Sequence, residues 1–179
     1  MTWNDNVELA KMADNAGFEA LLPVGRWKGY GGGTNFNNRT FESLTWAAGL
    51  AALTNYSTIF STVHAPLMHP VAVAKMSATI DHISNGRFAL NVVAGWFKNE
   101  FEMFDAELKE HGARYAYAAE WLEVIKRLWT EEEPFDYDGA YFRGNALWSQ
   151  PKPIQLPRPP IMNAGSSTMG QDFSAQYAD

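Results

Sequence analysis

One amide side chain interrupts an apolar run that is typical of a buried strand. The run spans 88–93 with the sequence FALNVV, and Asn91 is its polar exception. Burying an amide without a hydrogen-bond partner costs about 1–3 kcal/mol in proteins. Asn91 therefore bonds to a neighbouring strand or a water within the core, or it contacts a ligand near the carboxyl end of the strand. The residues alone leave both interpretations open.

A helix start rich in small residues is the second candidate for chemistry. Segment 163–168 reads NAGSST and follows a short apolar run. Small residues let a phosphate approach backbone amides, and serine and threonine hydroxyls add hydrogen-bond donors. The same residues are also ordinary helix N-caps. The segment therefore favours a phosphate cradle only in combination with other observations.

Three charged residues lie in predicted loops or at a predicted helix start: Arg26, Glu100 and Arg114. Taken singly, Arg26 fits a solvated loop cation, and Glu100 with Arg114 fits a surface ion pair worth about 0–1 kcal/mol. Arg114 and Tyr115 open a predicted helix, and the free backbone donors and dipole at a helix N-terminus favour an anion. An anion site at this helix start is the alternative to the surface pair.

Two of the four histidines, His64 and His69, lie in the loop 64–70, HAPLMHP. A spacing of five that is interrupted by proline does not place both side chains on one helix face, as a helical zinc motif would. We therefore expect no metal here. No side chain stands out as an indispensable acid or base. His64, as a donor or polar wall beside a substrate, is the one catalytic candidate, and a structural loop histidine is the simpler interpretation.

Apolar periodicity and turn residues predict the elements that position these side chains. We expect helices from Asn4 or Asp5 to Gly17, from Thr40 to about Leu53, and over 71–83, 114–129 and 165–177. We expect strands over 18–23, 56–63, 88–93 and 161–164, and a hairpin over 135–142 around Asp138-Gly139. A long, partly irregular connection (95–112) and a proline-rich linker (151–160) complete the chain. Strands that alternate with helices predict a parallel α/β sheet.

Composition excludes several classes of protein. The chain has 179 residues, 46% of them hydrophobic, a net charge of -6 and no cysteine. The charge and the lack of a basic patch argue against nucleic-acid binding. Without cysteine there are no disulfides, which fits a reducing cytoplasm. No apolar run approaches the ~20 residues of a membrane span. The N-terminus predicts an acidic amphipathic helix rather than a signal peptide.

Several longer motifs occur in order along essentially all 179 residues. They are RWKGYGGGTNF, FESLTWAAGLAALT, TIDHISNGRFALNVVAGW, KNEFEMF and ARYAYAAEWLEVIKRLW. With these motifs the chain resembles the bacterial luciferase-like, flavin-dependent monooxygenases. It is most similar to the branch that holds dimethylsulfone, alkanesulfonate and pyrimidine monooxygenases.

The resemblance implies a (β/α)8 barrel, whose functional residues lie on loops after the carboxyl ends of the strands. A complete barrel has eight strands and usually about 250 residues. This chain offers four barrel-type strands, so we expect one domain, 1–179, that forms a partial barrel with a small hairpin insertion. Compared with the family it looks like an N-terminal-half fragment. Its outer strands would then leave backbone groups unpaired, which favours aggregation.

The resemblance also implies an activity. Such enzymes take reduced flavin mononucleotide (FMN) from a separate flavin reductase and use O2 to insert one oxygen atom into a small organic substrate. For this chain we expect a small organic substrate such as a sulfone or sulfonate, and a homo-oligomer at full length. Three alternatives stay open: a pyrimidine-type enzyme, a deazaflavin-dependent oxidoreductase of the same family, and a non-catalytic half-barrel remnant.

Seven residues match family positions that contact the flavin. They are Gly25, Arg26, Asn91, Glu100, Arg114, Tyr115 and Ser167. The resemblance places Gly25 and Arg26 beside the flavin ring, where an N–H donor could meet its polar edge. It makes Ser167 the phosphate contact within segment 163–168.

Overall fold

The computed structural model describes residues 2–179. In chain order the elements are α1 (Trp3–Asn15), β1 (Ala20–Leu21), α2 (Ser43–Ala51), β2 (Thr58–His64), the short 3-10 helix η1 (Ala65–Leu67), α3 (Pro70–Ile83), β3 (Phe88–Val93), α4 (Lys98–Met103), α5 (His111–Thr130), β4 (Phe135–Asp138), β5 (Arg143–Leu147), β6 (Ile161–Met162) and α6 (Thr168–Tyr177). Strands therefore alternate with helices, as predicted.

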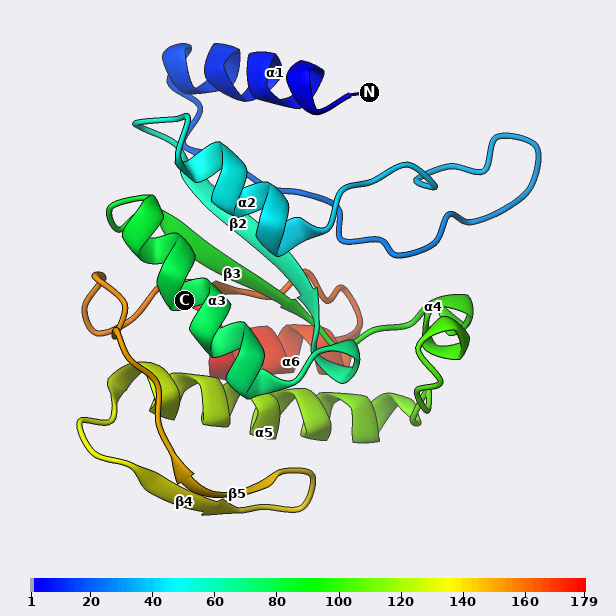
Figure 1. The fold of residues 1–179 in the computed structure, drawn as a ribbon. Coiled ribbons are helices and arrows are strands. Elements are labelled where there is room, and N and C mark those ends of the chain that lie inside the picture. Colours follow the sequence, from blue (N-terminus) through cyan, green and yellow to red (C-terminus); the bar gives the residue numbers. More distant parts are fainter. Residues whose placement is uncertain (1) are drawn as a thin grey trace.

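A parallel sheet forms the centre of the molecule, with the strand order β1-β2-β3-β6. This confirms the predicted parallel α/β sheet of four barrel-type strands. Within residues 2–179 the sheet is open rather than closed into a barrel. The carboxyl ends of β2 and β3 point toward the right of Figure 1, where α4 and the long loop between β1 and α2 also lie.

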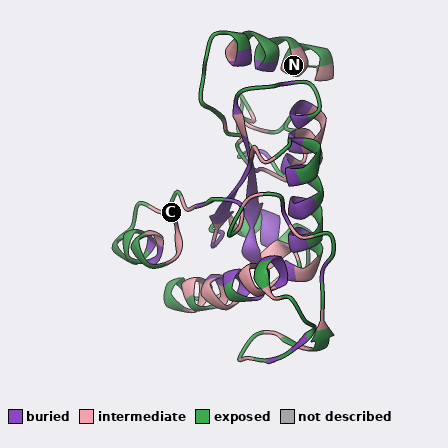
Figure 2. Cartoon of the chain, turned by 90° about the vertical axis from the view of Figure 1, so that its left-hand side faces the viewer, coloured by how far each residue is buried: buried purple, intermediate pink, exposed green. Residues whose placement is uncertain are grey.

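The two faces of the sheet have different roles because successive side chains of a strand point to opposite faces. Leu90 and Val92 on β3 belong to the hydrophobic core. Figure 2 shows α2 and α3 along one side of the sheet. Leu90 and Val92 belong to the same core cluster as residues of these two helices. Asn91 and Val93 alternate with them and line a cavity on the other side. The site is thus on the sheet face that α2 and α3 leave free.

One buried carboxylate fixes the proline-rich linker that leads into β6. Asp81 near the end of α3 is fully buried. Its Oδ2 accepts hydrogen bonds from the backbone N–H of Ile154 at 2.6 Å and of Gln155 at 3.0 Å. Its Oδ1 accepts from the Gln155 side chain at 2.6 Å. These bonds place the linker so that β6 pairs with the far side of β3.

The predicted hairpin is confirmed as the antiparallel pair β4 and β5, and it extends to Leu147 rather than ending at 142. The turn is centred on Ala140-Tyr141, two residues later than expected, and the Gly139 N–H donates to the Phe142 carbonyl. The Glu120 carboxylate on α5 accepts from the backbone N–H of the turn residues Ala140, Tyr141 and Phe142. The hairpin therefore packs beside α5, away from the carboxyl ends of the sheet strands.

Several predicted helix starts are wrong because other side chains supply the caps. Thr2, rather than Asn4 or Asp5, caps α1 through a reciprocal capping box with Asp5. Glu42 caps α2 by accepting from two backbone N–H groups. Thr40, the predicted cap, instead donates to the Arg26 carbonyl.

Other boundaries also differ from the sequence prediction. Helix α5 begins at His111, one turn before the predicted start at Arg114. The last helix begins at Thr168 rather than at Gly165. The outer strands β1 and β6 have two residues each, fewer than predicted, because each pairs with a single neighbour over a short register. Part of the connection 95–112 forms helix α4.

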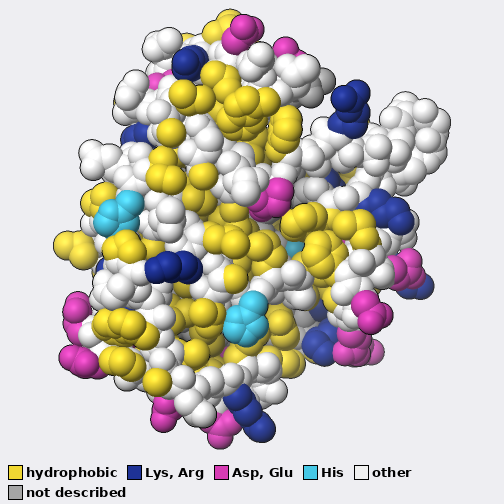
Figure 3. All heavy atoms as spheres, viewed as in Figure 1, with side chains coloured by type: hydrophobic (Ala, Val, Ile, Leu, Met, Phe, Trp, Pro, Cys, Tyr) yellow, Lys and Arg dark blue, Asp and Glu magenta, His cyan; other side chains and the backbone are white. Residues whose placement is uncertain are grey.

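The surface carries mixed charges. On the face shown in Figure 3, lysine and arginine side chains are scattered rather than gathered into one basic field. None of the helices within residues 2–179 combines the length and apolarity of a bilayer span. Over the same residues, His, Cys, Asp and Glu side chains do not gather in groups of three that could hold a metal ion.

Candidate active site

A cavity of about 400 Å³ lies at the carboxyl ends of the sheet strands. Each of the four strands contributes lining residues from itself or from the loop that follows it: 22–26 after β1, Thr62 on β2, Asn91 and 93–96 on and after β3, and 163–165 after β6. His111, Arg114 and Tyr115 on α5 complete the lining. Five of the seven residues predicted to bind flavin line it, namely Gly25, Arg26, Asn91, Arg114 and Tyr115. Glu100 and Ser167 lie just outside the lining.

Asn91 has one half of its amide bonded and the other half free. Its Nδ2 donates to Thr62 Oγ1 at 3.0 Å, and Thr62 Oγ1 donates to the Pro23 carbonyl at 2.7 Å. Because that carbonyl can only accept, the threonine hydroxyl must accept from the Asn91 nitrogen, which fixes the orientation of the amide. The Asn91 Oδ1 is buried and has no hydrogen-bond partner within residues 2–179. A buried free acceptor in a cavity wall favours a ligand that donates to it.

Gly25 lets the first loop approach the second strand. A Cβ atom at this position would lie 2.7 Å from the Thr62 carbonyl oxygen and 3.0 Å from its methyl group. A backbone oxygen cannot move aside as a flexible side chain could, so any larger residue would push the loop away from β2. The requirement for glycine here is therefore steric, and it brings the adjacent Arg26 to the cavity.

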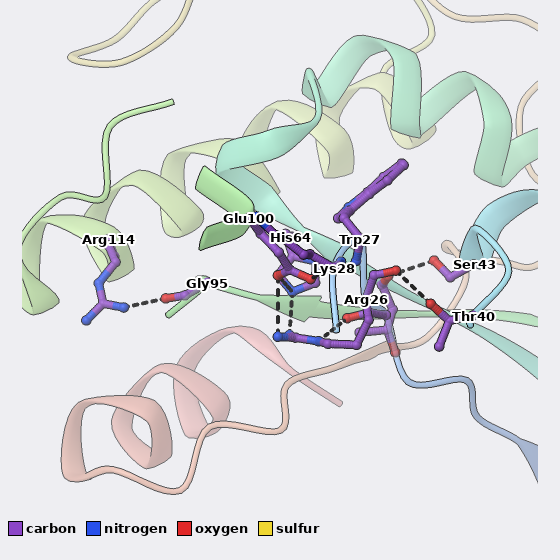
Figure 4. Close-up of polar contacts among 11 residues, drawn as sticks. Arg26, Trp27, Lys28, Thr40, Ser43, His64, Gly95, Glu100 and Arg114 are labelled. Carbon is purple, nitrogen blue, oxygen red and sulfur yellow. Dashed lines mark hydrogen bonds and ion pairs between the residues drawn. The ribbon is translucent and has the colours of Figure 1, made fainter. Parts of the chain in front are cut away.

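Arg26 is held from several sides at the cavity wall (Figure 4). Its Nε donates to the Gly25 carbonyl at 2.8 Å, and its Nη2 donates to His64 Nε2 at 2.9 Å. Its Nη1 lies 3.3 Å from Glu100 Oε2. Rings of Tyr30 and Trp96 lie within 6 Å of the guanidinium carbon, close enough for a cation–π contact. The interpretation of Arg26 as a solvated loop cation is therefore wrong.

Glu100 on α4 is fully buried, so a surface ion pair with Arg114 is wrong too. Its Oε1 accepts from the backbone N–H of Trp27 at 2.7 Å and of Lys28 at 3.3 Å. Its Oε2 lies 3.3 Å from Arg26 Nη1, and neither atom has a hydrogen-bond partner among the described residues. The contact between them is therefore one of charge and not a hydrogen bond. Glu100 thus supports the first loop from behind Arg26.

His64 at the end of β2 is a buried, neutral imidazole. Burial and the neighbouring Arg26 guanidinium lower the pKa of His64 to about 4. Its Nε2 also lies 3.7 Å from Glu100 Oε2, which would be an ion pair only if the ring were protonated. The shorter contact decides between the two: Arg26 can only donate, so Nε2 must be an unprotonated acceptor.

We predict that His64 makes the free energy of unfolding decrease as the pH is lowered. In the unfolded chain the pKa returns to about 6.5, so the unfolded chain takes up a proton that the folded protein resists. Stability is unaffected by this group above pH 6.5, decreases by up to about 3 kcal/mol as the pH falls to about 4, and loses nothing further below that. Urea unfolding of wild type and His64→Gln across pH 7.5 to 4 measures the difference.

The matched control variant, His64→Gln, should lack this decrease because glutamine does not titrate. Asp14 does not interfere. Burial would raise its pKa, but hydrogen bonds from the backbone of Ser57, Asn55 and Tyr56 prevail and hold it at about 2, below the window. Parallel pH curves for the two proteins between pH 6.5 and 4 would show that His64 is not the group responsible.

The starts of two helices meet at the other end of the cavity. Ser167 caps α6, and its Oγ accepts from the Gly170 N–H at 3.1 Å. His111, the first residue of α5, lies with its Nε2 3.4 Å from Ser167 Oγ. Arg114 donates through Nη1 to the Gly95 carbonyl, and its buried Nε has no partner among residues 2–179. Backbone donors, a hydroxyl and a guanidinium thus converge there, which suits a phosphate.

His111 is a site residue that the sequence did not reveal. It lines the cavity and contacts the cap of α6, 56 residues away in the chain. The prediction began α5 at Arg114, which put His111 in the preceding connection. A start signal was lacking, since the Glu110 cap makes no side-chain hydrogen bond. Only the packing of α5 against α6 brings this histidine to the site.

The parallel sheet, with a cavity where its strands end, defines an α/β protein of the kind in which ligands bind at that end. A family model described as luciferase-like monooxygenase matches residues 1–179. The chain belongs to this family.

A pyrimidine monooxygenase, RutA of Variovorax paradoxus (strain S110), is 37% identical over 176 residues, which is 97% of this chain and 47% of that protein. The chain spans about half the length of the curated relatives it matches.

Two solved structures share the fold. A riboflavin lyase (RcaE), solved with modified FMN and the substrate riboflavin, superposes with a TM-score of 0.87 at 23% identity, covering 97% of this chain and 45% of that chain. An F420-dependent secondary alcohol dehydrogenase superposes with a TM-score of 0.88 at 23% identity, covering 100% and 53%. Since flavin and F420 proteins share this fold, the fold alone does not select the cofactor, and only the residues of the site can.

The residues present fit FMN. Among residues 2–179, Asn91 Oδ1 and Arg114 Nε are buried polar atoms without a hydrogen-bond partner, and both residues line the same cavity. One suits a hydrogen-bond donor on a ring, and the other suits an anion beside two helix starts. FMN has both kinds of group, joined by a flexible chain.

Proposed function

We propose that the protein binds FMN in this cavity and acts as a flavin-dependent monooxygenase on a small organic substrate. The observation that carries the proposal is the convergence of Gly25, Arg26, Asn91, Arg114 and Tyr115 from separate segments onto one cavity. All five were matched to flavin contacts from sequence motifs alone. Family membership and the 37% identity to a pyrimidine monooxygenase support the reaction class.

Each residue has a role that follows from its surroundings. Asn91 would accept a hydrogen bond from the flavin ring through its free Oδ1, and Arg26 would donate to an acceptor beside it. Arg114, Ser167 and the N–H groups at the start of α6 would bind the phosphate. Bound FMN, once reduced, supplies the electrons with which O2 is activated for transfer of one oxygen atom. The apolar wall residues limit the access of water.

We further propose an uncharged ring of the pyrimidine type as the substrate, in preference to a sulfonate. Two arginines, Arg26 and Arg114, are the charged side chains in the lining of the cavity as described over residues 2–179. Glu100 offsets the charge of Arg26, and Arg114 lies at the phosphate end. A sulfonate near Arg26 would therefore meet a neutralised pair, whereas an uncharged ring loses no such interaction.

The resemblance to the family is the basis for two further proposals, which concern partners. Reduced FMN would come from a separate flavin reductase, and the full-length protein would form a homo-oligomer. A reducing cytoplasm suits both this supply and a chain without cysteine. A deazaflavin in place of FMN is the main rival, and the titration that tests the phosphate site addresses it directly.

We predict that Ser167→Ala weakens FMN binding about tenfold, because it removes one charge-assisted hydrogen bond worth about 1.5 kcal/mol. Riboflavin, which lacks the phosphate, should bind wild type and variant equally. Quenching of flavin fluorescence on titration measures both affinities. Arg114→Ala should weaken FMN binding in the same selective way.

A matched variant separates the phosphate contact from helix capping. Ser167→Asp keeps a good N-cap but puts a negative charge beside the phosphate, so it should retain the melting temperature and bind FMN more weakly than Ser167→Ala does. If both Ser167→Ala and Arg114→Ala bind FMN as tightly as wild type, the phosphate does not bind at these residues. If F420 saturates the protein and FMN does not bind, F420 rather than FMN is the cofactor.

A further inference from the structure

His64 lies behind the cavity wall rather than in it. Its side chain is 2% exposed, and it is absent from the lining, whereas its partner Arg26 is part of the lining. The 2.9 Å bond joins Arg26 Nη2 to His64 Nε2. Since arginine has no acceptor, the imidazole proton must be on Nδ1. His64 can therefore reach a ligand of the cavity only through Arg26.

We propose that His64 is a positioning residue: its neutral imidazole accepts a hydrogen bond from Arg26 and so holds the guanidinium against the cavity, where the remaining N–H donors meet an oxygen acceptor of the bound flavin ring. This inference rests on the proposed FMN site. It replaces a role for His64 as a proton donor to substrate, because the ring is separated from the cavity and its Nε2 carries no proton.

Three elements fix the guanidinium, and each uses a different part of it. The Gly25 carbonyl of the first loop accepts from Nε. His64 at the end of β2 accepts from Nη2, and Glu100 on α4 lies 3.3 Å from Nη1. Figure 4 shows these side chains pointing toward one another. Without His64 the guanidinium could rotate toward Glu100, since the contact with that carboxylate does not yet have hydrogen-bond geometry.

The other charged group near His64 is already engaged. Glu42, which lines the same cavity of about 10 Å³ as His64 and Arg26, accepts from the backbone N–H groups of Leu44 and Thr45. It therefore competes little for the guanidinium. The Arg26–Glu100 pair leaves the cluster with no net charge when His64 is neutral, and protonation of His64 would add an unpaired positive charge beside Arg26.

Flavin titrations of His64 variants test the proposal. His64→Leu removes the acceptor and should raise the Kd for FMN and for riboflavin by the same factor, about tenfold. His64→Gln, which keeps an acceptor, should stay within about threefold of wild type. His69→Leu, a histidine change in the same loop but outside the cluster, should leave both affinities unchanged. Equal affinities of His64→Leu and wild type would overturn the proposal.

A double-variant cycle shows whether His64 acts through Arg26. In the Arg26→Met background, His64→Leu should change the flavin Kd by less than about twofold, because the group that it positions is gone. An undiminished effect in that background would mean that His64 acts by another route. If wild type binds no FMN, the proposed function fails and the inference fails with it. If wild type binds FMN and His64→Leu binds it equally well, the inference alone fails.

A measurement without flavin covers the case of a poorly folded leucine variant. Nitrogen-15 NMR of the wild-type imidazoles should show His64 with its proton on Nδ1 and a hydrogen-bonded, unprotonated Nε2. In Arg26→Met the pKa of His64 should rise, because one cause of its depression is removed. A His64 proton on Nε2 in wild type would contradict the proposal whatever the flavin results.

Discussion

Replacing Glu100 by glutamine should cost about 3–5 kcal/mol of folding free energy, the usual effect of removing one partner of a buried charge pair. Glutamine keeps an acceptor for the Trp27 and Lys28 N–H groups but leaves the Arg26 guanidinium buried without a counter-charge. Urea unfolding at pH 7.5 measures the loss. The effect should extend to the cavity, since Glu100 supports the loop that carries Arg26.

Two controls make this prediction specific. Glu102→Gln on the same helix breaks an exposed pair with Lys98, whose side chains are 60% and 74% exposed, and should change stability by less than about 1 kcal/mol. The double variant Arg26→Met/Glu100→Gln removes both charges and should recover at least about 1 kcal/mol relative to Glu100→Gln. A Glu100→Gln protein as stable as wild type would show that the pair does not hold the loop.

Asn91→Leu should weaken FMN binding about tenfold or more while leaving the melting temperature nearly unchanged. Leucine has almost the same size, and its introduction leaves no donor without a partner because the Thr62 hydroxyl still donates to the Pro23 carbonyl. What disappears is the free Oδ1 in the cavity wall. With a looser ring position, more of the reduced flavin should be consumed to give hydrogen peroxide. Fluorescence titration and peroxide assays measure the two effects.

Thr62→Val is the matched variant with the opposite expectation. It leaves the Asn91 Nδ2 and the Pro23 carbonyl without partners, which should cost about 1–3 kcal/mol of stability, but it keeps Oδ1 in the wall. If Asn91→Leu instead loses stability and keeps its FMN affinity, Asn91 is a structural core residue and not a flavin contact.

The sequence predicted the elements with strong local signals. Strand β3 agrees with the prediction because an apolar run marks it locally. The end of α3 agrees because Asn85 and Gly86, which both have positive φ, directly follow its C-cap. Helix starts were predicted less well. Thr2 caps α1 and Glu42 caps α2, although other polar residues nearby are equally suitable as N-caps. Which residue becomes the cap depends on how the preceding chain approaches the helix.

The site was predicted as a set of residues but not as an arrangement. Motif resemblance named Arg26 and Glu100 as separate flavin contacts. The structure joins them to each other, across a separation of 74 positions, and to His64. Such contacts depend on the register of β2 against β3 and on the fold of α4, which no local pattern encodes. For the same reason His111 was missed, since its position beside Ser167 exists only once α5 packs on α6.

The most direct test of the FMN site is a crystal structure of the protein with FMN. The expected result is the phosphate between Arg114, Ser167 and the start of α6, with the ring against Asn91 and Arg26. The rival location is the larger hollow of about 760 Å³ that α5 lines together with Tyr137 of the hairpin and Tyr177 of α6. FMN bound in that hollow, with the cavity at the strand ends empty, would contradict the account.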